Sequence, residues 1–111
     1  MARDEAGIEA EIQAKGLTAA RLTPQQIDEA IVAEQYYTFP GTVLTVCCLT
    51  LRNGFNTTGT SAPVSAENFD EALGQKIARE NARNEIWKFE GYLLKQKLYD
   101  QAVGSMNGAG A

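Results

Sequence analysis

The hydrophobic and polar positions divide the chain into helical ends and an extended middle. The longest regular stretch runs from Ala66 to Leu98, contains no proline and is rich in helix formers. Ser65 comes directly before it and is a residue type that caps helices. The sequence therefore predicts one long helix from Ala66 to Leu98, followed by a Gly, Ala, Asn and Ser tail.

Apolar residues of this predicted helix fall on two nearly opposite faces. One face carries Phe69, Leu73, Ile77, Trp87, Leu94 and Leu98, and the other carries Ala78, Ala82, Ile86, Phe89 and Leu93. Two faces need two partners, so we expect one to pack on strands of the same chain and the other to meet the N-terminal helices or a second copy. We predict a homo-oligomer through the second face, at Ala82, Ile86, Phe89 and Leu93.

The extended middle begins with Thr42 to Arg52, which is apolar on alternate residues of both sides and predicts a strand covered on both faces. Asn53-Gly54 favours a tight hairpin turn, and Phe55 to Ser61 returns as the second strand. With a two-residue loop, Thr50 would pair with Thr57. Within the second strand, Gly59 indicates a bulge or a close approach to another element.

A third strand is predicted at Tyr36 to Phe39, because aromatic and β-branched residues favour extended structure and two strands alone are only marginally stable. Before it, Thr23-Pro24-Gln25-Gln26 predicts a capped helix start, with the helix running to about Glu34. Ala2 to Lys15 predicts a further helix, stopped by Gly16. Its apolar stripe is thin, so this segment either frays or orders against a partner.

These elements predict an α+β fold, in which N-terminal helices and an antiparallel hairpin, extended to three strands, pack on one long C-terminal helix. The domain organisation that follows is an N-terminal helical arm over residues 1–22, a single α+β domain over 23–99 and a disordered tail over 100–111. The length of 111 residues suits one domain.

Composition narrows the function classes. A net charge of -4 gives no electrostatic footprint for duplex nucleic acid, and no stretch approaches the roughly 20 apolar residues of a membrane helix. Cys47 and Cys48 are neighbours, which disfavours a disulfide between them and favours an intracellular protein. The chain has no histidine, no CxxC pair and no phosphate-loop lysine motif. We therefore predict no catalytic residues, no metal site, no cofactor and no enzyme activity.

Polar residues interrupt the first helical face between Ile77 and Trp87, where Glu80 and Asn84 replace the expected apolar side chains. Beside them, Lys76, Arg79 and Arg83 form a basic ridge at spacings of three and four. One reading is a solvated face with ordinary pairs within the helix. The other is a polar pocket beside aromatic side chains and the hairpin, suited to an anionic, planar ligand. On the second reading the ligand-binding residues are Arg52, Phe55, Phe69, Arg79, Asn81, Arg83, Asn84 and Trp87.

Several blocks of this sequence resemble a known family. They are the strand that ends in RNGF at Phe55, the NFD entry at Asn68, the glycine and alanines at Gly74, Ala78 and Ala82, and the IW and EGY blocks beginning at Ile86 and Glu90. In order and spacing they are similar to the small tailed-phage family named after gene forty-nine of coliphage N-four and gene sixty-six of phage Sf-six. The resemblance covers about Thr23 to Leu98. Pro63-Val64 departs from the family pattern, which affects only that loop.

The resemblance implies a phage accessory protein of the host bacterial cytoplasm. We expect similarity to the Thoeris anti-defence one proteins, which are oligomeric sponges that sequester cyclic ADP-ribose-type and related cyclic-nucleotide immune signals without cleaving them. That expectation accords with the absence of catalytic motifs and with the aromatic and arginine side chains of the helix. The alternative is a protein-protein inhibitor or adaptor that docks on a host protein through its acidic N-terminal helices and has no small-molecule ligand.

Overall fold

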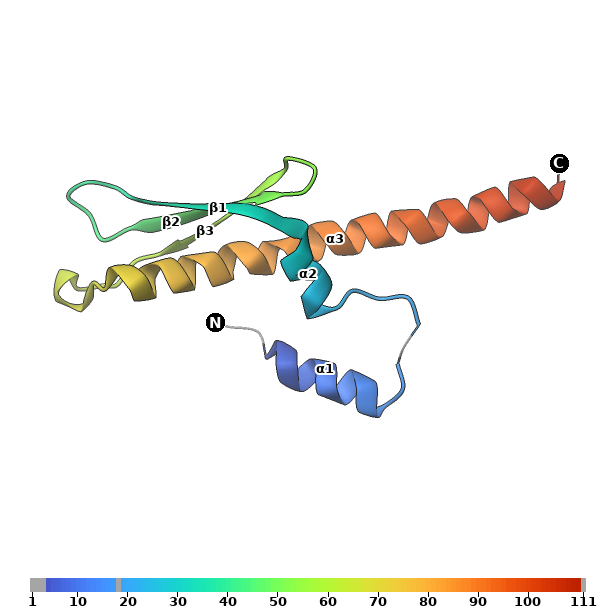
Figure 1. The fold of residues 1–111 in the computed structure, drawn as a ribbon, viewed down its shortest axis with the longest axis horizontal. Helices are drawn as coiled ribbons and strands as arrows, with labels where there is room; N and C mark the ends of the chain where they lie inside the picture. The colour runs from blue at the N-terminus through green and yellow to red at the C-terminus, as the bar shows by residue number, and fades with distance from the viewer. Residues whose placement is uncertain (1–3, 18, 111) are drawn as a thin grey trace.

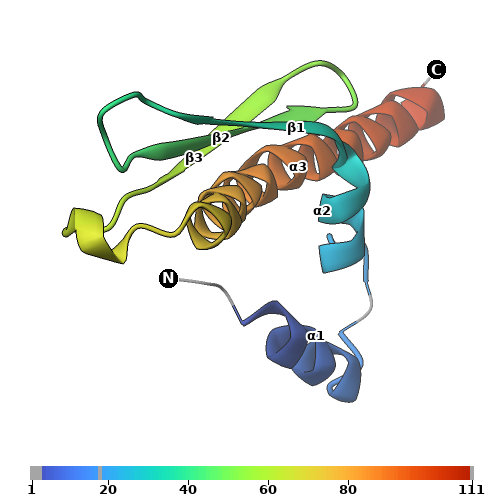
Figure 2. The same cartoon turned by 60° about the vertical axis from the view of Figure 1, so that its left-hand side comes forward.

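The computed structural model describes residues 4–17 and 19–110 and has an α+β architecture, as predicted (Figure 1). Its elements in chain order are the helices α1 (Glu5–Ala14) and α2 (Pro24–Ala30), the strands β1 (Ile31–Thr38), β2 (Thr45–Leu51) and β3 (Asn56–Ser61), the short 3-10 helix η1 (Ala66–Asn68) and the long helix α3 (Glu71–Gly110). The three strands form one antiparallel sheet in the order β1-β2-β3, which confirms the predicted third strand. One face of this sheet lies along α3 (Figure 2).

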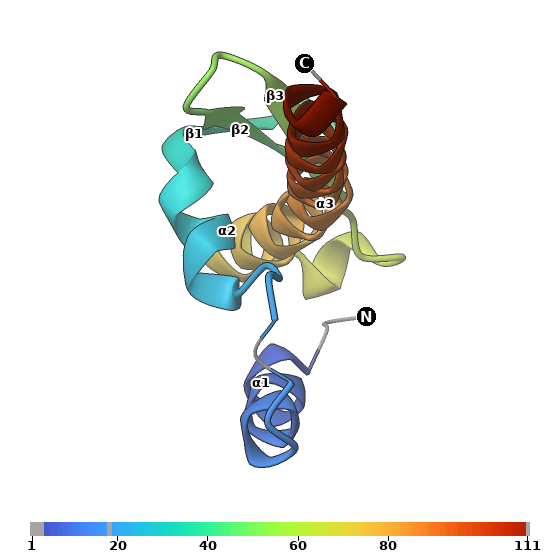
Figure 3. The same ribbon diagram turned by 90° about the vertical axis from the view of Figure 1, so that its right-hand side faces the viewer.

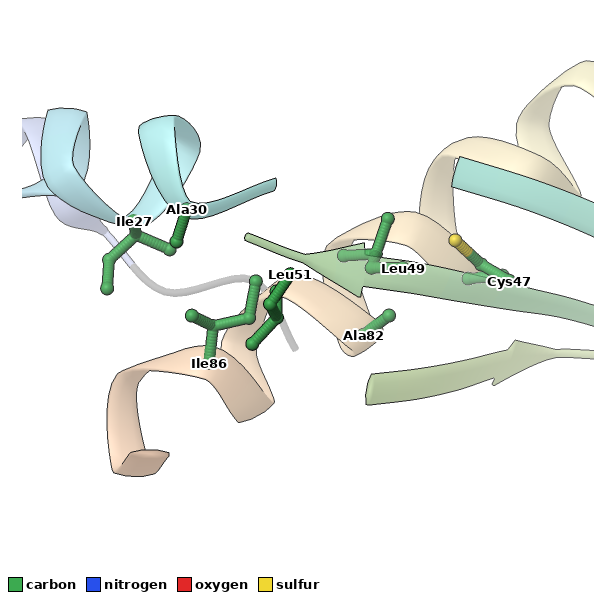
Figure 4. Packing of buried hydrophobic residues seen from close by; sticks show 8 residues of the cluster. Ile27, Ala30, Cys47, Leu49, Leu51, Ala82 and Ile86 are labelled. Carbon is green, nitrogen blue, oxygen red and sulfur yellow. The ribbon is translucent and has the colours of Figure 1, made fainter. Parts of the chain in front are cut away.

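The core forms where the sheet, α2 and the first half of α3 meet (Figures 3 and 4). Its buried members are Ile27, Ala30, Cys47, Leu49, Leu51, Ala78, Ala82 and Ile86. In β2 the buried positions alternate with half-buried ones, so one face of the strand packs on α3. The other face, with Val46 and Cys48, is only half-buried, and the expectation of two covered faces is therefore wrong.

The β2–β3 turn shifts the hairpin register by one residue from that of a two-residue loop. Leu51 N–H donates to the Phe55 carbonyl at 2.8 Å, and Gly54 N–H donates to the Leu51 carbonyl at 2.8 Å. Gly54 has a φ of 89°, in the left-handed region that suits the last residue of a three-residue loop. Leu49 consequently faces Thr57, which turns Thr57 toward the core.

Gly59 is a point of close approach between β3 and α3, which is one of the two roles predicted for it. A Cβ atom at this position would lie 2.2 Å from the Ala82 amide nitrogen and 2.3 Å from the Ala78 carbonyl oxygen. The two backbones can pack this tightly only because all three residues are small.

The helix boundaries differ from the sequence prediction at several points. α2 has the predicted capping box between Thr23 and Gln26, but it ends at Ala30. β1 starts at Ile31, because Ile31 and Val32 are β-branched and pairing with β2 favours the extended form. α3 begins at Glu71, not Ala66, since the Asp70 carboxylate accepts from Leu73 N–H at 2.8 Å.

The C-terminal half of α3 projects beyond the sheet (Figure 1). It continues to Gly110, so the prediction of a disordered tail from residue 100 is wrong for residues 100–110. Adding residues to an existing helix costs little, and the chain after Leu98 contains no proline. Residue 111 lies outside the described residues.

The prediction of the oligomer face is wrong for two of its four residues, Ala82 and Ile86. Ala82 and Ile86 are fully buried against the sheet of the same chain, because their face of α3 is the one that packs on β2 and β3. Phe89 and Leu93 lie further along the helix and stay 41% and 49% exposed. Only this second part of the face is open to a second copy.

Candidate functional site

The predicted ligand-binding residues do not gather into one pocket. Phe69 precedes α3, Arg52 and Phe55 lie in and beside the β2–β3 turn, and the others (Arg79, Asn81, Arg83, Asn84 and Trp87) are spread around α3. We therefore consider these groups by the elements that they contact.

Two of the α3 residues tie the helix to the outer strands. Arg79 Nε donates to the Glu34 carboxylate of β1 at 3.0 Å. Hydrogen bonds from the Tyr36 hydroxyl and from Arg79 hold the pKa of Glu34 below its usual value. On the other side, Asn81 Nδ2 donates to the Thr60 carbonyl of β3 at 2.9 Å. Arg79 and Asn81 thus fix the position of α3 under the sheet.

Arg83 and Trp87 make a second group, which contacts the N-terminal helices. Arg83 forms ion pairs with Glu5 of α1 and Asp28 of α2, the latter at 2.7 Å, and donates to the Pro24 carbonyl at 3.1 Å. Burial alone would lower the pKa of Arg83, but the hydrogen bonds to Asp28 and Glu5 raise it above its usual value. Trp87 Nε1 donates to the same Glu5 carboxylate at 2.9 Å.

The arginines of the polar interruption are therefore explained by distant parts of the same chain. Neither sequence reading included this arrangement, in which carboxylates of α1 and α2 pair with Arg83. Glu5 and Arg83 are 78 residues apart, and no local pattern indicates their contact.

An aromatic hollow lies between the β2–β3 turn and α3. The Phe55 and Phe89 rings meet edge to face with centroids 5.0 Å apart. The hollow has a volume of about 500 Å³, and its lining is mainly apolar. Besides these two rings it is lined by Leu51, Arg52, Asn53, Lys88, Glu90, Tyr92 and Leu93.

Arg52 is the cationic anchor of this hollow. Its two terminal nitrogens donate to the two Glu90 oxygens at 2.6 and 3.0 Å, in a bidentate pair. The Arg52 side chain is 55% exposed, whereas the Glu90 side chain is 10% exposed. Hydrogen bonding to Glu90 raises the pKa of Arg52. The pair also borders a second hollow of about 420 Å³, lined in part by Leu22 and Gln26 on the α2 side.

Sequence reasoning identified Arg52 and Phe55 but missed Lys88, Phe89 and Tyr92 as their neighbours. Phe89 had been assigned to the oligomer face, and Tyr92 follows it by three residues on the same side of α3. That spacing was a usable signal for an exposed aromatic patch. Its position beside the turn depends on how the hairpin docks, which periodicity does not show.

Three chemical features of the described residues bear on possible sites. Within residues 4–17 and 19–110, no group of three or more His, Cys, Asp or Glu side chains is arranged to hold a metal ion. Burial raises the pKa of the Cys47 thiol, which keeps it protonated and poorly nucleophilic. No helix in this part of the chain is long and apolar enough to span a bilayer. The absence of enzyme activity stays a prediction.

These features define a small α+β protein in which a three-stranded meander rests on one long helix. The chain belongs to the Phage protein (N4 Gp49/phage Sf6 gene 66) family, whose pattern matches residues 22–98. The match covers α2, the sheet and most of α3, and leaves α1 outside. No curated protein and no solved structure matches the chain.

Proposed function

We propose that this phage-family protein is a non-enzymatic counter-defence protein that binds and sequesters a cyclic nucleotide or cyclic ADP-ribose-type host immune signal in the bacterial cytoplasm. The observation that carries the proposal is the aromatic hollow beside Arg52. It combines two flat rings with two cationic side chains, Arg52 and Lys88, and this is the chemistry that a planar base bearing phosphates requires.

The size of the hollow supports a small-molecule ligand. Its volume of about 500 Å³ falls within the usual range of ligand pockets, which is about 300–1,000 Å³. A base would pack against Phe89 and Tyr92, whose side chains are 41% and 72% exposed. A phosphate would approach the exposed side of Arg52, because a guanidinium has five donor hydrogens and the bidentate pair with Glu90 uses two.

Sequestration in an oligomer is part of this proposal. The apolar side of α3 continues past the hollow through Leu93 to Tyr99, which is 60% exposed. A second copy packed on this side would cover the open hollow and exclude water from the ligand. The proposed oligomer face is thus Phe89, Tyr92, Leu93 and Tyr99, without the buried Ala82 and Ile86.

The test is isothermal titration calorimetry of the full chain with a panel of cyclic dinucleotides, cyclic trinucleotides and cyclic ADP-ribose isomers. At least one member should bind, and Phe89→Ala should weaken that binding about tenfold or more, since removing one aromatic platform costs about 1–3 kcal/mol per stacked base. Arg52→Gln should also weaken it.

Phe39→Ala is the matched control. Phe39 is 45% exposed and forms its own edge-to-face pair with Tyr37 at 4.8 Å, but it directly follows β1, at the β1–β2 turn, which is the opposite end of the antiparallel sheet from the β2–β3 turn. The Phe39→Ala variant should leave the affinity for the nucleotide ligand unchanged. Absence of binding by every panel member, or equal losses in Phe39→Ala and Phe89→Ala, would refute the proposed site.

A second candidate function is a protein-protein inhibitor or adaptor that docks on a host protein through the acidic N-terminal helices. It is supported by α1, which has no buried residue, follows the exposed N-cap Asp4, displays the acidic Glu11 at its surface and lies outside the family match. Deleting residues 1–16 would abolish such docking and leave nucleotide binding in the hollow intact. Phe89→Ala would instead weaken nucleotide binding in the hollow and leave such docking intact.

A further inference from the structure

The helix α1 lies in a groove formed by the rest of the chain, and it contacts this groove mainly through charged side chains. On α1, Glu5 and Glu9 lie one helical turn apart and point at two different arginines. Glu5 meets Arg83 and Trp87, while Glu9 forms a bidentate pair with Arg21 at 2.8 Å through both oxygens.

These contacts are largely shielded from water. The side chains of Glu5 and Arg83 are 18% and 13% exposed, and charge-assisted hydrogen bonds in such surroundings are strong and geometrically selective. The hydrogen bond to Arg21 lowers the pKa of Glu9 to about 2, so this carboxylate is charged at neutral pH.

The apolar fit of α1 is much poorer than its polar fit. No residue of α1 is buried, and Ile8 is 41% exposed. Beneath the helix a cavity of about 120 Å³ remains, lined in part by Ile8, Ile12, Leu22 and Trp87. Two isoleucines thus leave space that larger apolar side chains at the same spacing would fill.

We propose that this groove is a docking site for an acidic amphipathic helix of a partner protein, and that α1 occupies the groove in the same chain until the partner displaces it. The partner helix carries two carboxylates at i and i+4 for Arg83 and Arg21, with bulky apolar residues at i+3 and i+7. Charge complementarity selects this occupant, because α1 already presents the same pattern as Glu5, Ile8, Glu9 and Ile12.

The family match separates the groove from its present occupant. Leu22, Pro24, Arg83 and Trp87 lie within residues 22–98, whereas Arg21 and all of α1 lie outside them. Apart from Arg21, the docking site therefore lies in the part of the chain that matches the family, and α1 covers it from outside that part. This inference rests on the groove alone and does not depend on nucleotide binding in the aromatic hollow.

The experiment uses the full chain and a fluorescein-labelled peptide of its own residues 4–15 as the probe, followed by fluorescence anisotropy. Wild-type protein should bind the peptide weakly, because the tethered α1 competes at an effective concentration on the order of millimolar. The double variant Glu5→Gln/Glu9→Gln, which loosens α1, should bind it at least about tenfold more tightly. A peptide with phenylalanine in place of Ile8 and Ile12 should bind more tightly still.

Adding Arg83→Met to the double variant should lower the affinity for the peptide to the wild-type level or below. Trp87→Phe is a second variant for the same purpose, since it removes the indole N–H and keeps an aromatic ring in the groove. A peptide carrying glutamine in place of Glu5 and Glu9 is the matched control and should not bind. Equal peptide affinity in wild type and the double variant, or no effect of Arg83→Met and Trp87→Phe, would overturn the inference.

Discussion

Substitution of Gly59 by alanine is the sharpest test of how the sheet rests on α3. The added Cβ would lie 2.2 and 2.3 Å from the backbone atoms of Ala82 and Ala78, where ordinary contact begins at 3.4 Å. Both obstacles are backbone atoms, so no side-chain rotation relieves the overlap, and β3 must move by about 1 Å. Overpacking costs about 1–3 kcal/mol, and the rigid neighbours here indicate about 3 kcal/mol.

This cost is measurable by urea denaturation monitored by circular dichroism. A loss of about 3 kcal/mol corresponds to a fall in Tm of about 12–24 °C for a domain of this size. Gly104→Ala is the control, because nothing lies within 4 Å of a Cβ at that exposed position of α3. It should stabilise the helix by up to about 1 kcal/mol. A Gly59→Ala variant within about 0.5 kcal/mol of wild type would show that β3 and α3 do not meet in this way.

Three further predictions concern individual polar groups. Among the described residues, the buried Thr57 Oγ1 has no hydrogen-bond partner, so Thr57→Val should stabilise the fold by up to about 1 kcal/mol in urea denaturation; a loss of stability would reveal a partner. Glu90→Gln removes the charge that pairs with Arg52 and should cost about 1 kcal/mol, with a larger loss in 10 mM than in 1 M salt; no dependence on salt would contradict an ionic contact. Glu9 has a pKa of about 2 in the fold against 4.5 normally, so its stabilisation of α1 is complete above pH 4.5 and disappears as the pH falls through 2. The fluorescence of the single tryptophan, which lines the same groove, should report this transition, and a change completed by about pH 4 would contradict it.

The parts of the fold that local sequence determines were predictable. The capping box at Thr23 and Gln26 depends on four neighbouring residues, and it is present. The Asn53-Gly54 dipeptide likewise predicts the turn, but it does not set the loop length, and the two-residue register does not occur. That register depends on which strand face packs on α3, and this is a tertiary property.

The packing face of α3 was harder to identify. Periodicity indicates two apolar faces on α3. Part of the face that carries Ala78, Ala82 and Ile86 was predicted to contact a second copy of the protein. That face packs on the sheet because its alanines are small enough to accept the backbone at Gly59. Hydrophobic periodicity measures polarity along the helix and does not take side-chain size into account.

The candidate site was predictable only in part, because its contacts depend on the tertiary fold. Arg52 and Phe55 were selected from the turn, and both line the aromatic hollow. Arg83 was correctly placed in a polar interruption that ends at Trp87, but Glu5, the partner of both residues, lies on a helix for which fraying was one expectation. A contact over 78 residues follows from the tertiary fold and has no signature in the local sequence.

Recovery of intact ligand tests the sequestration hypothesis most directly. The protein is mixed with the cyclic nucleotide or cyclic ADP-ribose isomer that binds it best, passed through a filter that retains the protein, then heated to release the ligand for mass spectrometry. Sequestration predicts that the ligand is depleted from the filtrate and returns unmodified after heating, and that Phe89→Ala leaves it in the filtrate while Phe39→Ala does not. Ligand that stays in the filtrate with the wild-type chain, or returns as a cleaved product, would contradict a non-enzymatic binding protein with its site at the aromatic hollow.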